Sequence, residues 1–388
     1  MIPLDSLLIL LFLMLAVCSA LYHLAVTVAA LRFRGGSADF SSFTPPVSVL
    51  KPLRGIEQNF YATLATFFRQ DYPHFEIVFG LSDANDPARW TIAQLQRDFP
   101  AARVKIIIAP EFPGTNPANP QNPKMSKLEG MLAAAAHEIV VLSDADIRVE
   151  PGYLRRVTRP LADERIGLVT CLYRGVPAGS FLSILESLCM SGDFAGQVLL
   201  ARMVSGIRFG LGATMATRKK QIAAIGGIGK WADYLADDYV LGREIAAAGY
   251  RIHLSRAVVE TVLPRRTARQ TFQQQLRWAR TIRACSPQGY PGLIFVFGVP
   301  LAFFAWALQP GSALALAILA AVSLARMFSA WTAGVLVCED RVLAKHLWLL
   351  PLRDLFALGV WVMSFLGREV VWRDARYRLE PGGRIRPA

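Results

Sequence analysis

The stretch EIVVLSDADI, residues 138–147, decides the fold that we expect for this chain. Its apolar Ile-Val-Val-Leu is typical of a strand buried on both faces, and two aspartates follow where the strand ends. Four further runs share this apolar character: VSVLKPL at 47–53, FEIVFGLSD at 75–83, VKIIIAP at 104–110 and IGLVTCLYRG at 166–175. Strands separated by helical or loop segments predict an α/β domain with a mostly parallel sheet, from about residue 45 to residue 288.

Acidic residues follow two of these strands. Asp83 comes after residues 77–82, and Asp144 and Asp146 come after residues 139–142. Ligands of such sheets bind outside the carboxyl ends of the strands, so we expect the site there. Two carboxylates one residue apart can share Mg²⁺ or Mn²⁺, which take their other ligands from water and a substrate diphosphate. Taken alone, the triplet is more often an ordinary acidic turn.

Two segments of the same domain could complete a site. Lys124, in QNPKMSKLEG, could neutralise a diphosphate, although a solvated surface lysine is the commoner case. The stretch WADYLADDYVLGREI, residues 231–245, predicts a helix that begins near Asp237 and Asp238. Acids in a first helical turn commonly complement the helix dipole, but one such carboxylate could also remove a proton from an acceptor hydroxyl.

Residues 264–283 form a basic segment with six arginines and no acid. Gln274, Arg277 and Trp278 make a QxxRW pattern whose members lie on one face of a helix. A basic amphipathic helix on a membrane surface is the alternative interpretation, and we expect both to hold, with arginines at lipid phosphates and the QxxRW face at the substrate. A nucleic-acid arm fits poorly directly before apolar segments.

Composition places part of the chain in lipid. Hydrophobic residues make up 53% of the 388 residues and charged residues 18%, and the mean hydropathy is +0.35, which excludes a disordered chain. The net charge of +13 suits an anionic or phosphorylated partner or a membrane surface. The five cysteines form no CxxC pair, so neither a zinc site nor a disulfide framework is indicated.

Apolar segments stand at both ends. Residues 7–31 carry no formal charge and are long enough for a membrane anchor. A cleaved signal peptide fits less well, and Arg32 and Arg34 predict that the anchor ends in the cytoplasm and its N-terminus faces outward. Further spans are expected at about 293–308 and 312–338, with an apolar region at 347–366. Either this last region is a re-entrant or in-plane pair, or residues 312–350 cross the membrane twice, and this choice stays open.

The order of these motifs resembles the membrane-bound inverting glycosyltransferases with a GT-A type nucleotide-sugar-binding domain, a group with cellulose, hyaluronan and ceramide glycosyltransferases. The match to the ceramide glucosyltransferase family is closer and covers nearly the whole chain. It rests on VSVLKPLRG, LATFFRQDYPHFEI, SDANDP, NPKMSKL, SDADIRVEP, YLADDY, QQQLRWARTIR and WRDARYRL. The resemblance implies N- and C-terminal transmembrane and interfacial helices around a cytoplasmic domain. With the composition along the chain, we expect an anchor at 1–34, the cytoplasmic domain at 45–288, transmembrane and interfacial helices at 291–370 and a basic tail at 371–388.

The resemblance also implies roles for individual residues. Asp238 would be the catalytic base, Asp144 and Asp146 would hold Mn²⁺ or Mg²⁺, and Asp193 and Trp278 would line the acceptor pocket. The UDP-sugar would be bound by Lys51, Pro52, Glu57, Asp83, Lys124, Asp144, Gln274, Arg277 and Trp278. Two departures stand out: many relatives have Asn at Lys127, and eukaryotic ceramide enzymes have His near Asp193.

The sequences CLYRG, LADDYVLG and LRWARTIRACSPQGY are more similar to those of a bacterial, hopanoid-associated branch of this family. That branch transfers N-acetylglucosamine from UDP-N-acetylglucosamine to bacteriohopanetetrol. The resemblance therefore implies a multi-pass protein of the bacterial inner membrane whose partners are a UDP-sugar, a lipid acceptor and the bilayer, with no nucleic acid. Its oligomeric state stays open.

Three classes of function are compatible with the motifs. A lipid glycosyltransferase acting on a hopanoid, or alternatively on ceramide, needs a divalent cation and a lipid acceptor. A processive polysaccharide synthase would make polymer from sugar nucleotide alone, and the short set of C-terminal spans speaks against it. A membrane scaffold without catalysis would not require the acids at Asp83, at Asp144 with Asp146, and at Asp238.

Overall fold

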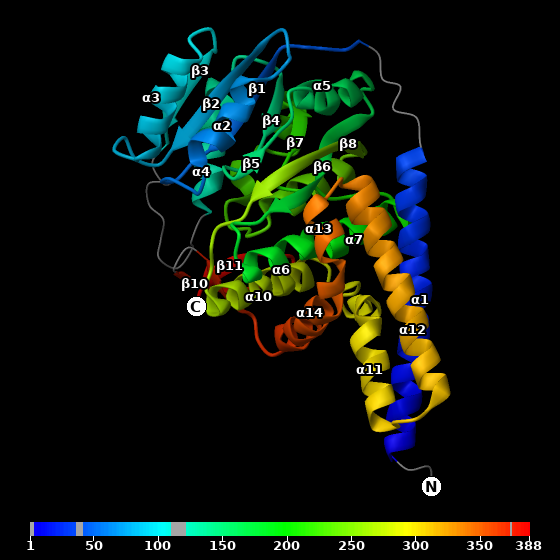
Figure 1. Cartoon of the computed structure of the whole chain (residues 1–388). Helices are drawn as coiled ribbons and strands as arrows, with labels where there is room; N and C mark the ends of the chain where they lie inside the picture. Colours follow the sequence, from blue (N-terminus) through cyan, green and yellow to red (C-terminus); the bar gives the residue numbers. More distant parts are fainter. Residues whose placement is uncertain (1–3, 36–41, 110–121, 373–374) are drawn as a thin grey trace. The chain divides into compact units, whose positions relative to one another are not determined.

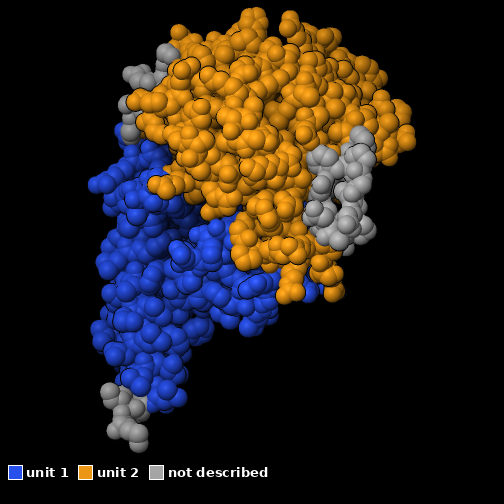
Figure 2. Space-filling model, turned by 180° about the vertical axis from the view of Figure 1, so that it is seen from behind, with its two compact units in different colours: residues 1–36, 179–206, 265–375 blue, residues 37–178, 207–264, 376–388 orange. Residues whose placement is uncertain are grey.

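The chain folds into two compact units, seen in the computed structural model, which describes residues 4–35, 42–109, 122–372 and 375–388. The sheet unit comprises residues 37–178, 207–264 and 376–388, and the helical unit comprises residues 1–36, 179–206 and 265–375 (Figure 2). Residues 373 and 374 of the basic tail lie outside the described residues.

The sheet unit is built on an eight-stranded sheet with the order β3-β2-β1-β4-β7-β6-β8-β5 (Figure 1). The strands are β1 Val47–Pro52, β2 Phe75–Leu81, β3 Val104–Ile108, β4 Ile139–Leu142, β5 Ile147–Arg148, β6 Ile166–Val176, β7 Met215–Arg218 and β8 Arg251–Val262. Strands β3, β2, β1 and β4 run parallel, as do β6 and β8, whereas β7 is antiparallel to both its neighbours and β5 to β8. The predicted mostly parallel sheet is confirmed.

Alternation along the central strands creates a core on each face of the sheet. Val47 and Val49 of β1 join one core, and Leu50 joins the other. In β4, Val141 and Val140 divide in the same way. Each strand is therefore apolar on both faces, which is why its sequence reads as a continuous run.

Helices of the sheet unit supply the other half of each core. Residues of α2, α3 and α5 enter the first core, and residues of α4, α8 and α9 enter the second. The helices are α2 Phe60–Phe68, α3 Ala88–Asp98, α4 Pro123–Ala134, α5 Tyr153–Thr158, α8 Lys219–Ala224 and α9 Asp237–Ala247. Two strands of the tail, β10 Ala375–Leu379 and β11 Ile385–Pro387, pair antiparallel.

Among its described residues, the helical unit holds five helical stretches that are long and apolar enough to cross a membrane: residues 4–35, 181–204, 290–308, 313–337 and 341–365. Four correspond to the predicted anchor and C-terminal segments, and 181–204 is an addition. The elements are α1 Leu4–Gly35, α6 Phe181–Cys189, the π-helix η2 Met190–Phe194, α7 Ala195–Val204, α10 Ala268–Cys285, η4 Tyr290–Phe297, α11 Gly298–Leu308, α12 Ala313–Ala330, the π-helix η5 Trp331–Val337, α13 Arg341–His346, η6 Leu347–Leu349, α14 Leu350–Phe365 and β9 Glu369–Trp372. The length and apolar character of these helices indicate a membrane protein.

A buried network of charges joins the apolar helices. Arg326 of α12 donates to both carboxylate oxygens of Asp354 at 2.8 and 2.9 Å, and it also binds the carboxylate of Asp193. Arg353 approaches the second oxygen of Asp193 at 3.4 Å. Two guanidinium groups therefore balance two carboxylates, and all four residues are less than 9% exposed. Neutral pairing of this kind is what ionisable groups need inside an apolar segment.

Loss of Arg326 should strongly destabilise the helical unit. Arg326→Ala leaves Asp354 and Asp193 without their shared partner in a buried site, which typically costs about 3–5 kcal/mol. The free energy of unfolding in detergent, measured by denaturant titration, checks this. Arg341→Ala, at an exposed arginine of the same unit, should change it by less than about 0.5 kcal/mol. Equal effects of the two substitutions would contradict the role given to the network.

Candidate active site

Lys51 ties the end of β1 to the Asp-Ala-Asp turn that follows β4. The two strands are adjacent and parallel, so their carboxyl ends lie at one edge of the sheet. The buried Lys51 ammonium donates to the Oγ atom of Ser143 at 3.4 Å and to the main-chain oxygen of Asp144, and it lies 4.1 Å from the centre of the Phe67 ring. Burial lowers the pKa of Lys51 to about 7, although the nearby carboxylates of Asp146 and Asp144 oppose the shift.

Lys124 joins two acidic segments that are far apart in the sequence. Its Nζ atom lies 2.8 Å from Oδ1 of Asp144 and 2.9 Å from Oδ2 of Asp237. Burial alone would lower the pKa of Lys124, but these two carboxylates raise it above its usual value. The side chain is fixed at the start of α4, where the Asn122 side chain accepts a hydrogen bond from the Lys124 main-chain nitrogen at 3.0 Å. Lys124 is therefore a charged and positioned group.

Asp238 stands in the first turn of α9 with its carboxylate held by main-chain donors. Its Oδ2 atom accepts a hydrogen bond from the nitrogen of Gly212 at 2.7 Å, and its Oδ1 atom accepts one from Tyr239 at 2.8 Å. Burial, followed by the charge of Asp237, raises the pKa of Asp238 to about 6. The carboxylate is thus ionised near neutral pH and is basic enough to accept a proton.

Gly212 marks the point where the carboxylates of Asp144 and Asp238 converge. A β-carbon at this position would lie 3.0 Å from Oδ2 of Asp238 and 3.2 Å from Oδ2 of Asp144. Gly242 allows a second close approach, because a β-carbon there would lie 2.1 Å from the nitrogen of Gly210. These glycines let α9 and the loop at 206–212 bring Asp238 beside Asp144. Neither glycine was predicted from the sequence, and the glycine-rich GIRFGLG at 206–212 was the available signal for Gly212.

Negative charge exceeds positive charge at this edge of the sheet. Burial, with the nearby carboxylates of Asp144 and Glu57, raises the pKa of Asp146 to about 7. The groups that act on one another here are the carboxylates of Glu57, Asp144, Asp146, Asp237 and Asp238 and the ammonium groups of Lys51 and Lys124. Among these described groups, acids outnumber cations by five to two.

The Asp-Ala-Asp turn fits a divalent cation that takes ligands from a substrate. In the described part of the chain, no three His, Cys, Asp or Glu side chains gather closely enough to hold a metal ion. Asp144 and Asp146 offer hard carboxylate oxygens, and one oxygen of Asp144 is already bound by Lys124. Mg²⁺ commonly binds through one or two carboxylates, water and substrate phosphates, so the donor set is compatible with it.

The loops after β1 and β2 are joined by a residue that sequence reasoning missed. The main-chain nitrogen of Gly55 donates to both carboxylate oxygens of Asp86 at 3.0 Å. Asp83, in the same loop, is exposed and accepts a hydrogen bond from the nitrogen of Asn85 at 2.8 Å. Pro52 is the last residue of β1. The predicted contacts of Asp83 and Pro52 with a nucleotide stay predictions.

The QxxRW residues lie on α10 of the helical unit, so their part in the donor site stays a prediction. The structure does assign other partners to arginines of this segment. Arg266 binds both carboxylate oxygens of Glu186 at 2.7 and 2.8 Å. Arg280 and Arg283 donate to main-chain oxygens at 363–369, at and after the end of α14. These three arginines therefore stabilise the helical unit, and the expected contacts of this segment with lipid phosphates stay a prediction.

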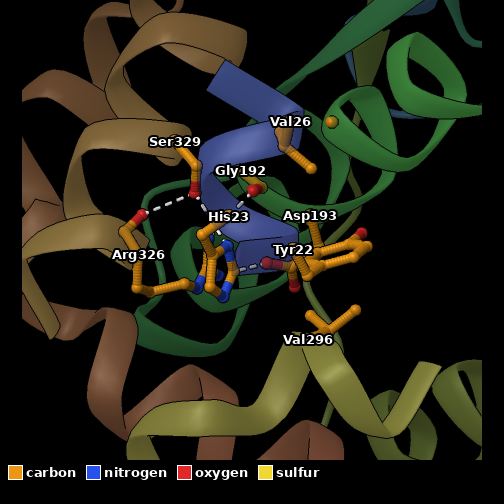
Figure 3. A pocket seen from close by; sticks show the side chains of 9 residues that line it. Tyr22, His23, Val26, Gly192, Asp193, Val296, Arg326 and Ser329 are labelled. Carbon is orange, nitrogen blue, oxygen red and sulfur yellow. Dashed lines mark hydrogen bonds and ion pairs between the residues drawn. The ribbon is translucent and has the colours of Figure 1, made fainter. Parts of the chain in front are cut away.

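Asp193 lines a small polar pocket of the helical unit (Figure 3). The His23 ring lies in this pocket, where its Nδ1 atom is 2.9 Å from Oγ of Ser329. Arg326 lies there too and binds the Asp193 carboxylate. Asp193 thus serves the helical unit as a counter-ion, and its predicted contact with an acceptor stays a prediction.

The chain is similar in sequence to known glycosyltransferases. The family model of glycosyl transferase family 21 matches residues 8–385. The chain is 27% identical over 240 residues to ceramide glucosyltransferase 3 of Caenorhabditis elegans, a match that covers 61% of this chain and 50% of that protein. It is 24% identical over 365 residues to ceramide glucosyltransferase 1 of the same organism, covering 88% and 73%. The chain thus spans about half the length of the first relative.

A solved structure shares the fold. A mannosyltransferase of Pyrobaculum calidifontis, in complex with GDP-Man and Mn²⁺, aligns with a TM-score of 0.51 and 19% identity. The alignment covers 91% of this chain and 99% of that one. This likeness confirms the expected GT-A type fold.

Substitution of Gly212 should disturb the two carboxylates without disturbing the sheet. In Gly212→Ala the new methyl group enters the contact between Asp144 and Asp238, and such overpacking typically costs about 1–3 kcal/mol. Denaturant titration should show this loss. Gly152→Ala is the matched control, because a β-carbon there would meet only the Arg156 guanidinium, at 3.9 Å. A Gly212→Ala protein as stable as the control would show that the carboxylates do not converge there.

Proposed function

The chain belongs to glycosyl transferase family 21, and from this we propose that it is a membrane-bound inverting glycosyltransferase that moves a sugar from a UDP-sugar to a lipid hydroxyl. One observation carries the proposal. Lys124 and Gly212 hold Asp144, Asp237 and Asp238 together at the carboxyl edge of the sheet. The expected acids of a sugar-nucleotide site thus come from separate parts of the chain to one place.

Asp238 is the base of the proposed reaction. Its carboxylate takes the proton of the lipid hydroxyl, the hydroxyl oxygen attacks the anomeric carbon of an α-linked UDP-sugar, and the bond to UDP breaks. The product is β-linked because the attack inverts the anomeric centre. Asp237 is poorly suited to the same role, since its carboxylate is already bound by Lys124 at 2.9 Å.

The leaving diphosphate gains negative charge as the bond breaks. Lys124 lies beside the acids and would bind the diphosphate, with Arg277 of the QxxRW segment as a second cation. Asp144 and Asp146 would hold Mn²⁺ or Mg²⁺, which neutralises developing charge on phosphate oxygens when it is bound. The excess of carboxylates over ammonium groups in this cluster supports the assignment. Lys51, by its bonds to Ser143 and Asp144, holds the turn that carries these carboxylates.

The remaining donor and acceptor contacts are proposals from sequence. Pro52, Glu57 and Asp83 would contact the nucleotide at the ends of β1 and β2. Gln274 and Trp278 would close over the donor and the acceptor. Asp193, which Arg326 and Arg353 already neutralise, would line the acceptor pocket as part of a balanced ion network.

Two acceptors are proposed. The bacterial motif resemblance favours N-acetylglucosamine transfer from UDP-N-acetylglucosamine to bacteriohopanetetrol. Ceramide is the second candidate, and the two ceramide glucosyltransferase relatives support it at least as well. Both lipids partition into a bilayer, which accords with the five apolar helices. We place the protein in the bacterial inner membrane with its sheet unit in the cytoplasm, where sugar nucleotides are made.

A product analysis tests the proposal directly. The detergent-extracted protein is incubated with Mn²⁺ or Mg²⁺, each of several UDP-sugars, and either bacteriohopanetetrol or ceramide, and the lipids are identified by mass. A lipid carrying one sugar is expected, and a chelator should abolish it. A sugar polymer formed without lipid would instead indicate a polysaccharide synthase. No turnover of any UDP-sugar with either lipid would contradict the proposed function.

Removal of the base should stop transfer but spare donor binding. We expect Asp238→Asn to lower kcat by about 10²- to 10⁴-fold with little change in UDP-sugar affinity. Asp237→Asn is the matched variant, and it should weaken donor binding more than kcat because it removes a partner of Lys124. Initial rates and calorimetric titration with UDP-sugar measure both. A fully active Asp238→Asn enzyme beside an inactive Asp237→Asn enzyme would assign the base to Asp237.

A further inference from the structure

The basic tail forms a hairpin that belongs to the sheet unit. Strands β10 and β11 pair with Leu379 opposite Ile385, and both side chains are buried, at 3% and 1% exposure. Gly382 and Gly383 form the turn with φ values of +84° and +89°, a conformation that favours glycine. The tail hairpin, residues 375–387, is therefore a folded element with its own apolar contacts.

The tail hairpin pairs with the loop that leads into α9. The main-chain nitrogen of Ile385 donates to the oxygen of Asp233 at 2.8 Å, and the nitrogen of Leu235 donates to the oxygen of Gly383 at 3.1 Å. These bonds flank an antiparallel bridge between residues 234 and 384. The loop at 233–235 thus gains a strand partner, and Asp237 and Asp238 begin α9 directly after it.

One exposed side chain strengthens this pairing. Arg384 donates from Nε to the hydroxyl of Tyr234 at 2.9 Å, and the same nitrogen lies 3.5 Å from Oδ2 of Asp233. Its guanidinium also lies 5.3 Å from the centre of the Tyr234 ring. A second arginine of the hairpin, Arg386, pairs instead with Glu380 of the hairpin itself at 2.8 Å. Only Arg384 of these two makes a contact with the loop.

Asn122 holds the loop from its other side. Its main-chain nitrogen donates to the oxygen of Ala232, and its Nδ2 atom donates to the oxygen of Tyr234 at 3.3 Å. The same fully buried residue caps α4, whose first turn carries Lys124. The loop before Asp238 is therefore bound between the tail hairpin and the cap of α4.

From these contacts we infer that the tail hairpin is a positioning element of the transferase site. It fixes the loop at 233–235 and thereby the place of the Asp238 carboxylate beside Gly212. The inference rests on the proposed function for the role of Asp238 as the base. The hairpin itself touches none of the reacting atoms in this account and acts through Asp238 alone.

Hydrogen exchange tests the positioning without reference to activity. A protein that lacks residues 384–388 loses the Ile385 bond and the bridge to the loop. The amides of Leu235, Gly212 and Tyr239 should then exchange at least about tenfold faster, while those of β1 and β2 keep their protection. Unchanged exchange at Gly212 and Tyr239 would overturn the inference, and it would do so even if the protein transferred no sugar.

Kinetics test whether the positioning matters for the reaction. The deletion should lower kcat about ten- to one hundredfold, because small misplacement of a catalytic group is costly, and should change KM for the UDP-sugar little. In the Asp238→Asn background the same deletion should lower the residual rate by less than about threefold, since the group that it positions is already lost. Equal losses in both backgrounds would reveal a general structural role and refute the inference.

A point substitution keeps the test valid if the deletion fails to fold. Arg384→Glu places a negative charge against Asp233, whereas Arg386→Glu places one against Glu380 within the hairpin. We expect Arg384→Glu to accelerate exchange at Tyr239 and to lower kcat severalfold, with Arg386→Glu within twofold of wild type in both. Identical behaviour of the two variants would contradict the inference. A wild-type protein without transfer would refute the proposed function alone, because the exchange comparison still decides the positioning.

Discussion

The ion pairs of Lys124 with Asp144 and Asp237 are the interaction on which the site depends. Carboxylates repel one another, and burial makes that repulsion stronger because little water screens it. A single ammonium group between an acid of the Asp-Ala-Asp turn and an acid of α9 offsets this repulsion. The two segments can then lie side by side, and Asp238 comes with its neighbour Asp237.

Close backbone contacts at two glycines also help to bring the carboxylates together. Gly212 leaves space for two carboxylates where any side chain would crowd them, and Gly242 lets α9 reach the loop at 206–212. Asn122 and the tail hairpin hold the loop in front of α9 from two sides. Burial, together with the charge of neighbouring carboxylates, raises the pKa values of Asp146 and Asp238. Sites that store such repulsion are the usual places for binding and catalysis.

The helical unit also contains buried charged groups, and these lie in apolar surroundings. The buried ion network there consists of Arg326, Arg353, Asp193 and Asp354, which lie in segments long enough to cross a membrane. Each of its two guanidinium groups has a carboxylate partner. Arg280 and Arg283 stabilise the chain where α14 ends by donating to main-chain oxygens. Some arginines of the basic segment at 264–283, which in the sequence suggest a membrane-binding surface, thus have partners inside the helical unit. The expected contacts of this segment with lipid phosphates stay a prediction.

The sequence alone determined the elements and the chemical types of the site. Strands buried on both faces must be apolar runs, spans must be long and uncharged, and the acids at 144, 146 and 238 follow a strand or begin a helix, so local pattern was sufficient to predict them. Only the tertiary structure decided which groups meet. The bridge made by Lys124, the convergence of carboxylates at Gly212, the partners of Arg326 and the pairing of the tail with residues 233–235 all join segments distant in the chain. No local periodicity carries that information, because such contacts arise from packing and charge balance in three dimensions.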